Sequence, residues 1–296
     1  MRVVVGGLRL RNPVIAASGT FGFGAEYAEI YDPARLGAVC TKGLTLMPRQ
    51  GNPPPRLWET AGGLLNSIGL QNPGIEAFIR EELPRMKAQG ITVITNVWGN
   101  DPGEYERSVA RLCDSSVDAI EINVSCPNVS RGGPVGEDAI RTAAVVRRSR
   151  KVCTLPLWVK LPPAGGLAVA RTAQEEGADA VSAVNTFRGM AIDIKTGKPV
   201  FVNVVAGLSG PAIKPIALRI VYELAAALTI PVVGIGGIGD WRDALEFIMA
   251  GAHAVQVGTA NFVDPLAAVK IVAGLEKYME ENKITDWEGI RGNAQQ

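Results

Sequence analysis

The chain has 296 residues, of which 47% are hydrophobic, and its 30 basic and 29 acidic side chains leave a net charge of +1. This length and composition are typical of a globular chain with one large domain or two modest ones, and the balanced charge gives no electrostatic case for binding nucleic acid or an anionic membrane. Four dispersed cysteines and a single histidine argue against a zinc or iron–sulfur site in this chain, and without a secretory signal we expect no disulfides.

The first predicted element is a β-hairpin in the segment VVVGGLRLRNP, residues 3–13. Arginines interrupt the N-terminal segment, which lacks the continuous apolar core of a signal peptide, so we expect a cytoplasmic protein. The longest apolar stretch, residues 216–238, is broken by Arg219, Glu223 and Pro231. It is too interrupted to span a bilayer.

Short runs rich in Val, Ile and Ala recur along the chain, and each is followed by a segment with helical spacing. We predict strands at residues 14–18, 38–42, 92–96, 119–123, 157–161, 180–185, 232–236 and 254–258. We predict helices at residues 75–89, 102–113, 137–148, 167–176, 213–228, 241–250 and 265–281. Aspartates at positions 101, 240 and 264 are typical of helix starts, and glycines at 90, 177 and 251 of helix ends.

Eight β/α units of this length predict a single domain over residues 1–296, an α/β fold of the closed (β/α)₈ TIM-barrel type. An open doubly wound sheet is the alternative. The N-terminal hairpin would plug the bottom of such a barrel. Two long segments, residues 51–74 and 191–207, look like inserted hairpins or loops, the second with a Thr196-Gly197 turn. In a barrel, such insertions lie over the C-terminal face, where they would roof a site.

Polar residues and glycines stand at the predicted carboxyl ends of the strands, where a barrel brings them into one pocket. They are Ser18, Lys42, Asn96, Asn123, Lys160, Asn185, Thr186, Gly236, Gly237, Gly258 and Thr259. Lysines and amides together suit a polar, planar ligand. The glycines after the last two strands, each just before a helix, indicate a phosphate-bearing cofactor or substrate, with tight turns alone as the alternative.

Cys126 follows the strand at 119–123, and Pro127 ends the strand by removing a backbone donor. The thiol is therefore presented at a strand end, although a buried structural cysteine is the alternative. His253, at the start of a strand, is typical of a structural histidine, so proton transfer falls to Cys, Lys, Asp, Glu or Tyr. Lys42 and Lys160 could form a Schiff base or hold negative charge on a bound ring, and the abundant asparagines favour the second.

These motifs resemble the class 1 dihydroorotate dehydrogenases, which are FMN-dependent barrels of pyrimidine (UMP) biosynthesis. The matching segments run in order along the chain: CTKGLT (40–45), GNPPPRLWET (51–60), LNSIGLQNPG (65–74), NVSCPN (123–128), LWVKL (157–161), GLSGPAIKPIALR (207–219), GIGGI (234–238) and VQVGTA (255–260). The segments at 51–60, 65–74 and 207–219 resemble the class 1B catalytic subunit in particular. One departure is Trp98-Gly99, where the family has smaller residues.

The resemblance implies roles for individual residues. Cys126 would take the proton from C5 of (S)-dihydroorotate while hydride passes from C6 to N5 of FMN, and Lys42 would contact both flavin and substrate. The implied FMN-binding residues are Ser18, Lys42, Gly43, Asn96, Asn123, Lys160, Val184, Gly210, Gly236, Gly237, Gly258 and Thr259. The implied substrate-binding residues are Lys42, Asn66, Ser67, Ile68, Gly69, Leu70, Asn123, Asn128, Asn185 and Thr186. The segment 130–138 is hypothesised to form a mobile lid over Cys126.

Class 1B resemblance also implies a partner subunit that carries FAD and a [2Fe-2S] cluster and passes electrons to NAD, around a homodimeric core within a heterotetramer. A class 1A homodimer that reduces fumarate is the alternative within the family. A flavin-free lyase with Lys160 as a Schiff-base residue is an alternative from another class of enzyme. A non-catalytic scaffold is a third alternative, against which the intact Cys126 and both lysines argue.

Overall fold

Eight parallel strands form a closed barrel in the computed structural model, which describes residues 1–125 and 135–295. The strands are β3 (Val14–Ala16), β4 (Ala38–Cys40), β7 (Val93–Val97), β8 (Ala119–Asn123), β9 (Leu157–Lys160), β10 (Ala180–Ala183), β15 (Val232–Ile235) and β16 (Ala254–Val257). They neighbour one another in chain order, and β16 pairs with β3 to close the ring. The predicted barrel and all eight predicted strands are confirmed, and the open sheet was wrong.

The barrel strands are buried on both faces because helices cover the outside and side chains fill the inside. The lower half of the interior is an apolar cluster. It consists of Val5, Leu8, Leu10, Ile15, Ala38, Cys40, Ile94, Ala119, Trp158, Ala180, Val233 and Ala254. Three of these residues come from the antiparallel hairpin of β1 (Val3–Val5) and β2 (Leu8–Leu10). This confirms the predicted hairpin and its position at the bottom of the barrel.

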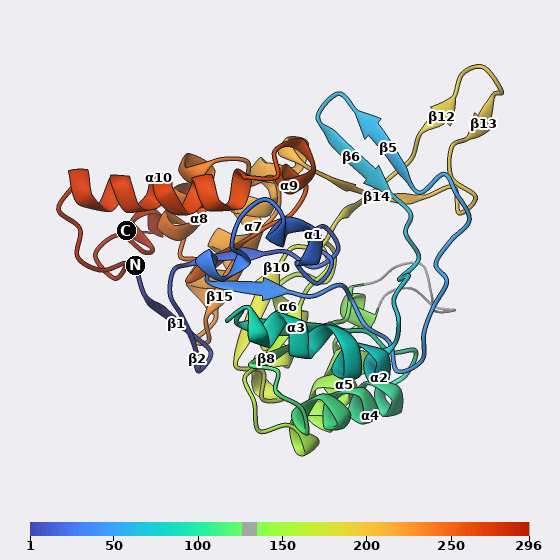
Figure 1. The fold of residues 1–296 in the computed structure, drawn as a ribbon, viewed down its shortest axis with the longest axis horizontal. Coiled ribbons are helices and arrows are strands. Elements are labelled where there is room, and N and C mark those ends of the chain that lie inside the picture. The colour runs from blue at the N-terminus through green and yellow to red at the C-terminus, as the bar shows by residue number, and fades with distance from the viewer. Residues whose placement is uncertain (126–134, 296) are drawn as a thin grey trace.

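The helices surround the barrel (Figure 1). They are α1 (Ala25–Ala28), α2 (Ile75–Ala77), a π-helical stretch (Phe78–Glu82), α3 (Leu83–Ala88), α4 (Pro102–Cys113), α5 (Ala139–Val152), α6 (Gly166–Glu175), α7 (Lys214–Ala227), α8 (Trp241–Met249), α9 (Ala260–Val263) and α10 (Ala267–Glu281). Short 3-10 helices lie at Pro33–Arg35, Val135–Glu137, Pro211–Ile213 and Asn293–Gln295. All seven predicted helices are present.

Most helix boundaries differ from the prediction by one to four residues, and capping explains the later starts of α5 and α10. α5 begins at Ala139 because the Asp138 carboxylate accepts hydrogen bonds from the backbone of Ile140 and Arg141. α10 begins at Ala267, two residues later than predicted, since Asp264 caps the preceding turn by accepting from the Leu266 N–H at 2.9 Å. The short helices α1 and α9 were not predicted.

The two insertions join in one antiparallel sheet above the barrel. Its strand order is β11 (Phe187–Gly189), β14 (Ala206–Ser209), β6 (Gly63–Asn66) and β5 (Leu57–Thr60). A small hairpin of β12 (Ile192–Asp193) and β13 (Lys198–Pro199) extends beyond it, with the predicted turn between the strands (Figure 1). The sheet-like insertions are confirmed, whereas their pairing across the sequence, with Gly207 opposite Asn66, was not predicted.

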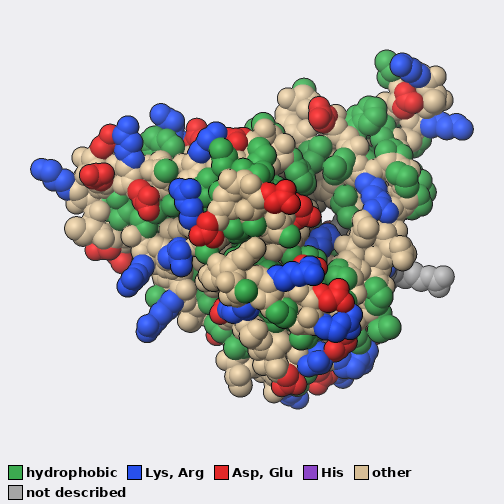
Figure 2. All heavy atoms as spheres, in the orientation of Figure 1, with side chains coloured by type: hydrophobic (Ala, Val, Ile, Leu, Met, Phe, Trp, Pro, Cys, Tyr) green, Lys and Arg blue, Asp and Glu red, His purple; other side chains and the backbone are tan. Residues whose placement is uncertain are grey.

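The surface carries Lys or Arg and Asp or Glu side chains interspersed over the visible face (Figure 2), in keeping with the balanced charge. The first residue is tied to the segment after α10, because the Trp287 indole donates to the Met1 carbonyl oxygen at 3.3 Å. Over residues 1–125 and 135–295, no helix is long and apolar enough to cross a bilayer.

Candidate functional site

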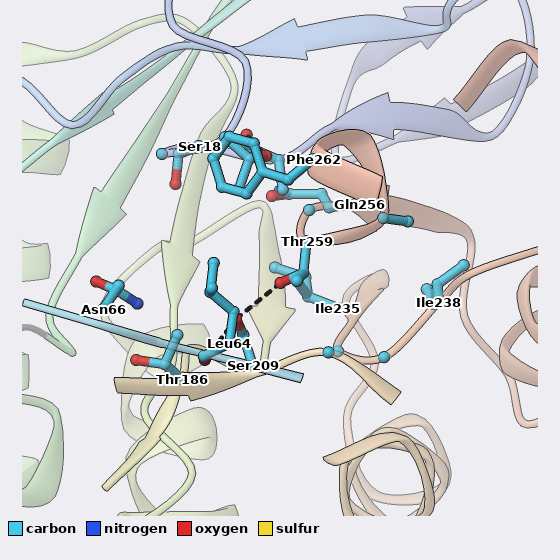
Figure 3. Close-up of a pocket in the computed structure, with 18 of the residues that line it drawn as sticks. Ser18, Leu64, Asn66, Thr186, Ser209, Ile235, Ile238, Gln256, Thr259 and Phe262 are labelled. Carbon is cyan, nitrogen blue, oxygen red and sulfur yellow. Dashed lines mark hydrogen bonds between the residues drawn. The ribbon is translucent and has the colours of Figure 1, made fainter. Parts of the chain in front are cut away.

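A cavity of about 580 Å³ opens at the carboxyl ends of the barrel strands, between the barrel mouth and the inserted sheet (Figure 3). Eighteen of the predicted residues line it. They are Ser18, Lys42, Gly43, Asn66, Ile68, Gly69, Leu70, Asn96, Asn123, Lys160, Val184, Asn185, Thr186, Gly210, Gly236, Gly237, Gly258 and Thr259. The structure therefore brings together residues spread over some 240 positions of sequence.

Among the described residues that line the cavity, three predicted residues are not found. Cys126 and Asn128 lie outside the described residues, as does most of the segment hypothesised to be a lid. Ser67 is 3% exposed, and its hydroxyl oxygen accepts hydrogen bonds from Asn52 at 3.1 Å and from Asn203 at 3.4 Å. Its side chain thus holds the neighbouring loops together.

One wall of the cavity consists of backbone at Gly236 and Gly237, whose φ angles of 129° and 72° suit glycine alone. Within the described chain, no protein acceptor takes the N–H of either residue. The following helix α8 is capped by its own Asp240, which accepts from the N–H groups of Arg242 and Asp243. An anion here would therefore bind to the glycine N–H groups, since the helix N-terminus is already occupied.

A second glycine wall lies at the end of the neighbouring strand β16, at Gly258, where a Cβ atom would sit 3.6 Å from Ala17, an ordinary contact. The adjacent Thr259 hydroxyl donates to Ser209 of the inserted sheet at 2.7 Å (Figure 3). This bond ties the roof of the cavity to the barrel, so both glycine walls face the same enclosed space.

The amides predicted to recognise a polar ring form one hydrogen-bonded chain. The Asn123 amide donates to Asn96 Oδ1 at 3.4 Å, and its own Oδ1 accepts from the Ser125 hydroxyl at 2.6 Å. Ser125 in turn accepts from the Asn185 amide at 2.6 Å, and Asn185 Oδ1 accepts from the N–H of Thr186. Each side chain is thereby held in one orientation at the barrel mouth.

The cavity floor carries a buried cation and an unpaired acceptor. Lys160 is 4% exposed, and its ammonium donates to the Ser18 hydroxyl at 3.2 Å. Gln256 is 1% exposed, and its Oε1 has no hydrogen-bond partner in the described chain. Because buried polar atoms are nearly always satisfied, the orphaned oxygen indicates a ligand with a hydrogen-bond donor. The alternating residues of β16 could have revealed Gln256, since it stands two positions before Gly258.

The predicted substrate turn at residues 66–70 is anchored from behind by two asparagines. The Asn72 amide donates to the Leu70 carbonyl oxygen at 2.7 Å, and its Oδ1 accepts from the Gly74 N–H at 2.8 Å. The N–H of Asn52 donates to the Ile68 carbonyl oxygen at 3.0 Å. These bonds hold the backbone of Leu70 at a φ of 58°, a conformation that is uncommon for leucine.

Two further residues of the sequence analysis lie away from the cavity. His253 precedes β16, at the opposite end of that strand from the cavity, and burial lowers the pKa of its imidazole to about 4. It is therefore neutral at neutral pH. Trp98 is 3% exposed and packs beneath the Arg49 guanidinium, 5.0 Å from its ring centre. It is not among the residues that line the cavity.

Comparison with known proteins gives a consistent result over nearly the whole chain. A family model described as dihydroorotate dehydrogenase matches residues 1–279. The chain is 53% identical to the dihydroorotate dehydrogenase B (NAD(+)), catalytic subunit, of Petrotoga mobilis over 98% of each chain. It is 52% identical to the protein of that name from Thermoanaerobacter pseudethanolicus, over 99% of this chain and 98% of the other. For the protein of that name from Citrifermentans bemidjiense, the identity is 51% over 99% and 97%.

Proposed function

The chain belongs to the dihydroorotate dehydrogenase family, and we propose that it is the FMN-bearing catalytic subunit of an NAD-linked enzyme that oxidises (S)-dihydroorotate to orotate. The observation that carries the proposal is the cavity at the barrel mouth, which two glycine walls, a buried lysine and a chain of amides line together. FMN has a phosphate for the glycine N–H groups and a polar ring for the amides. The residues present therefore fit this cofactor.

The proposed FMN-binding residues fall into two groups. Backbone at Gly210, Gly236, Gly237, Gly258 and Thr259 would hold the phosphate end, while Ser18, Lys42, Gly43, Asn96, Asn123, Lys160 and Val184 would surround the ring. The bound flavin would supply the acceptor for the hydride that leaves C6 of the substrate. Lys160 is desolvated and close to the floor, so its charge would stabilise negative charge on the reduced ring.

The chemistry of the chain's own residues is a proton transfer. Cys126, as thiolate, would take the proton from C5 of dihydroorotate as the hydride leaves C6, so that the C5–C6 bond becomes double and orotate forms. Lys42 and the proposed substrate-binding residues would hold the ring and its carboxylate. These are Asn66, Ile68, Gly69, Leu70, Asn123, Asn128, Asn185 and Thr186, while Ser67, which was also predicted to bind substrate, would support the turn from behind the cavity. The chain's single histidine, His253, is not among the described residues that line the cavity, which supports a thiol in the role of base.

The relatives are named as catalytic subunits, and we infer that this chain too works with a partner subunit. The partner would carry FAD and a [2Fe-2S] cluster and pass electrons to NAD in the cytoplasm, around a homodimeric core of the present chain. Assaying the chain with fumarate, and with NAD in the presence of a co-purified flavoprotein, tests this proposal. Turnover with fumarate alone would contradict it and favour the class 1A arrangement.

A pre-steady-state comparison tests the role of Cys126. With a reference pKa near 8.5, only about 3% of a cysteine is thiolate at pH 7, so flavin reduction by dihydroorotate should accelerate toward alkaline pH. In Cys126→Ser, FMN should stay bound while its reduction slows at least about 100-fold, because a serine hydroxyl is a far poorer base. Cys113→Ser, at the end of α4, is the matched control and should reduce like the parent. A Cys126→Ala variant with the parent's rate and pH profile would refute the assignment.

A further inference from the structure

A buried carboxylate lies inside the barrel between the apolar plug and the cavity. Glu121, at the centre of β8, is 0% exposed. Its Oε1 accepts from the Cys40 thiol at 3.3 Å and from the Asn96 amide at 2.7 Å. Its Oε2 accepts from the Ser182 hydroxyl and from the Gln256 amide, both at 2.7 Å. Four neutral groups thus replace the water that a carboxylate would lose on burial.

All four neighbours act as donors toward Glu121. An ionised carboxylate has acceptor sites only, so each neighbouring group must turn an N–H, O–H or S–H toward it. Burial raises the pKa of the Cys40 thiol well above its usual range, and the negative charge of Glu121 adds to this effect, so the thiol stays protonated and donates. The two amides must likewise turn their NH₂ groups downward.

This requirement fixes what the amides present to the cavity. An amide side chain can normally be reversed, because its oxygen and nitrogen are nearly equal in size. With the NH₂ of Gln256 held by Glu121, its Oε1 is left as the unpartnered acceptor at the cavity floor (Figure 3). With the NH₂ of Asn96 held in the same way, its Oδ1 is presented to the amide of Asn123.

The same orientation passes along the rim of the barrel. Asn123 must donate to Asn96, so its Oδ1 is free to accept from the Ser125 hydroxyl. With its hydrogen used there, the Ser125 oxygen accepts from Asn185, whose own Oδ1 then meets the Thr186 N–H. Each link has one consistent donor direction, and the chain of bonds begins at the carboxylate. Reversing the first amide would place two donors or two acceptors against each other along it.

We propose that Glu121 is a positioning residue that sets the donor and acceptor pattern of the cavity, orienting Gln256 and the Asn96–Asn123–Ser125–Asn185 chain toward the flavin and dihydroorotate. The inference rests on the proposed function. Glu121 contacts neither ring: it orients the amides through hydrogen bonds, and its negative charge below the floor in addition opposes negative charge on a reduced ring. A glutamine at this position would replace one of the two acceptor oxygens with a donor NH₂ group. Some of the four neighbouring donors would then face another donor, so the amide of Asn96 or Gln256 would have to reverse its orientation.

The test compares three variants as FMN-loaded chains, by orotate affinity from the visible spectrum and by the flavin reduction potential. Glu121→Gln should weaken orotate binding about ten-fold or more through misoriented amides. It should also raise the reduction potential by at least about 30 mV, a ten-fold change in the two-electron equilibrium. Ser125→Ala breaks the chain beyond Asn123, so it should weaken orotate binding while the potential stays at the parent's value. Ser182→Ala removes a hydrogen bond to Glu121 from a residue that does not line the cavity. This variant should therefore match the parent in both orotate affinity and reduction potential.

The readouts separate this assignment from a merely structural role. If Glu121→Gln does not fold, Ser125→Ala still tests the chain of bonds, since it changes one small side chain above the carboxylate. Parental orotate affinity in Ser125→Ala, or equal losses in Glu121→Gln and Ser182→Ala, would overturn the proposal. A parent chain that holds no FMN or binds no orotate would instead overturn the proposed function itself.

Discussion

Lys160 offers the most quantitative prediction, because its surroundings define how strongly its charge is felt. The side chain is 4% exposed at the cavity floor, and it donates to a neutral hydroxyl, that of Ser18. Lys160→Met keeps the length and the apolar stem of the side chain and removes the charge. We expect FMN to remain bound through the glycine walls. The reduced flavin should lose most of the electrostatic stabilisation that the Lys160 charge gives it.

The magnitude follows from the burial of the ammonium. Two unit charges about 4 Å apart interact by about 4 kcal/mol at an effective dielectric constant of about 20. About 1.4 kcal/mol corresponds to about 30 mV for a two-electron couple, so the reduction potential of FMN should fall by up to about 90 mV. A flavin that is harder to reduce should also be reduced more slowly by dihydroorotate.

The assay is an anaerobic redox titration against reference dyes, with Lys270→Met as the matched control. Lys270 also lines the cavity, but its side chain is 64% exposed and paired with Asp264 at 2.6 Å. Water screens such a charge, so the control should shift the potential by less than about 10 mV. Equal shifts in the two variants, or a parental potential in Lys160→Met, would refute the role assigned to the buried charge.

Two further predictions concern the phosphate wall and the single histidine. Gly258→Ala should raise the FMN dissociation constant at least about ten-fold, because it places a methyl group where the phosphate meets the backbone. Without cofactor the variant should have the melting temperature of the parent, because the new Cβ has only an ordinary contact with Ala17. Gly289→Ala, at an open surface position, is the control, and an unchanged FMN affinity in Gly258→Ala would contradict the phosphate assignment. The pKa of His253 is about 4 in the folded chain against about 6.5 in the unfolded chain. Between pH 6.5 and pH 5 the unfolded state therefore gains a proton that the folded state does not. The free energy of unfolding should consequently fall by about 2 kcal/mol between pH 7 and pH 5. Urea unfolding at both pH values should show this loss in the parent and not in His253→Gln, and an equal loss in both would show that other groups cause it.

The barrel and most of the cavity lining could be predicted because they follow from local sequence patterns. Buried strands and capped helices recur with the period of a (β/α)₈ fold, and the fold then dictates that residues such as Lys42 and Asn185 share one mouth. The pairing of β6 with β14 could not be predicted, since it depends on contacts across some 140 residues with no local signal. The same holds for α9, a single turn whose sequence resembles a loop.

The polar floor was missed for a different reason. Glu121 and Gln256 lie inside strands that read as continuous apolar runs, and only the inward and outward alternation of a barrel strand distinguishes them. Counting back two positions from Asn123 and from Gly258 would have found both. The role of Cys126 stays a prediction, since this residue lies outside the described part of the chain.

The visible spectrum of the purified chain, recorded before and after anaerobic addition of dihydroorotate, tests both the cofactor and the substrate. We expect a yellow protein that releases one FMN per chain on denaturation and bleaches when dihydroorotate is added, with orotate formed in equal amount. A colourless chain, or a bound flavin that stays oxidised in the presence of dihydroorotate, would contradict it.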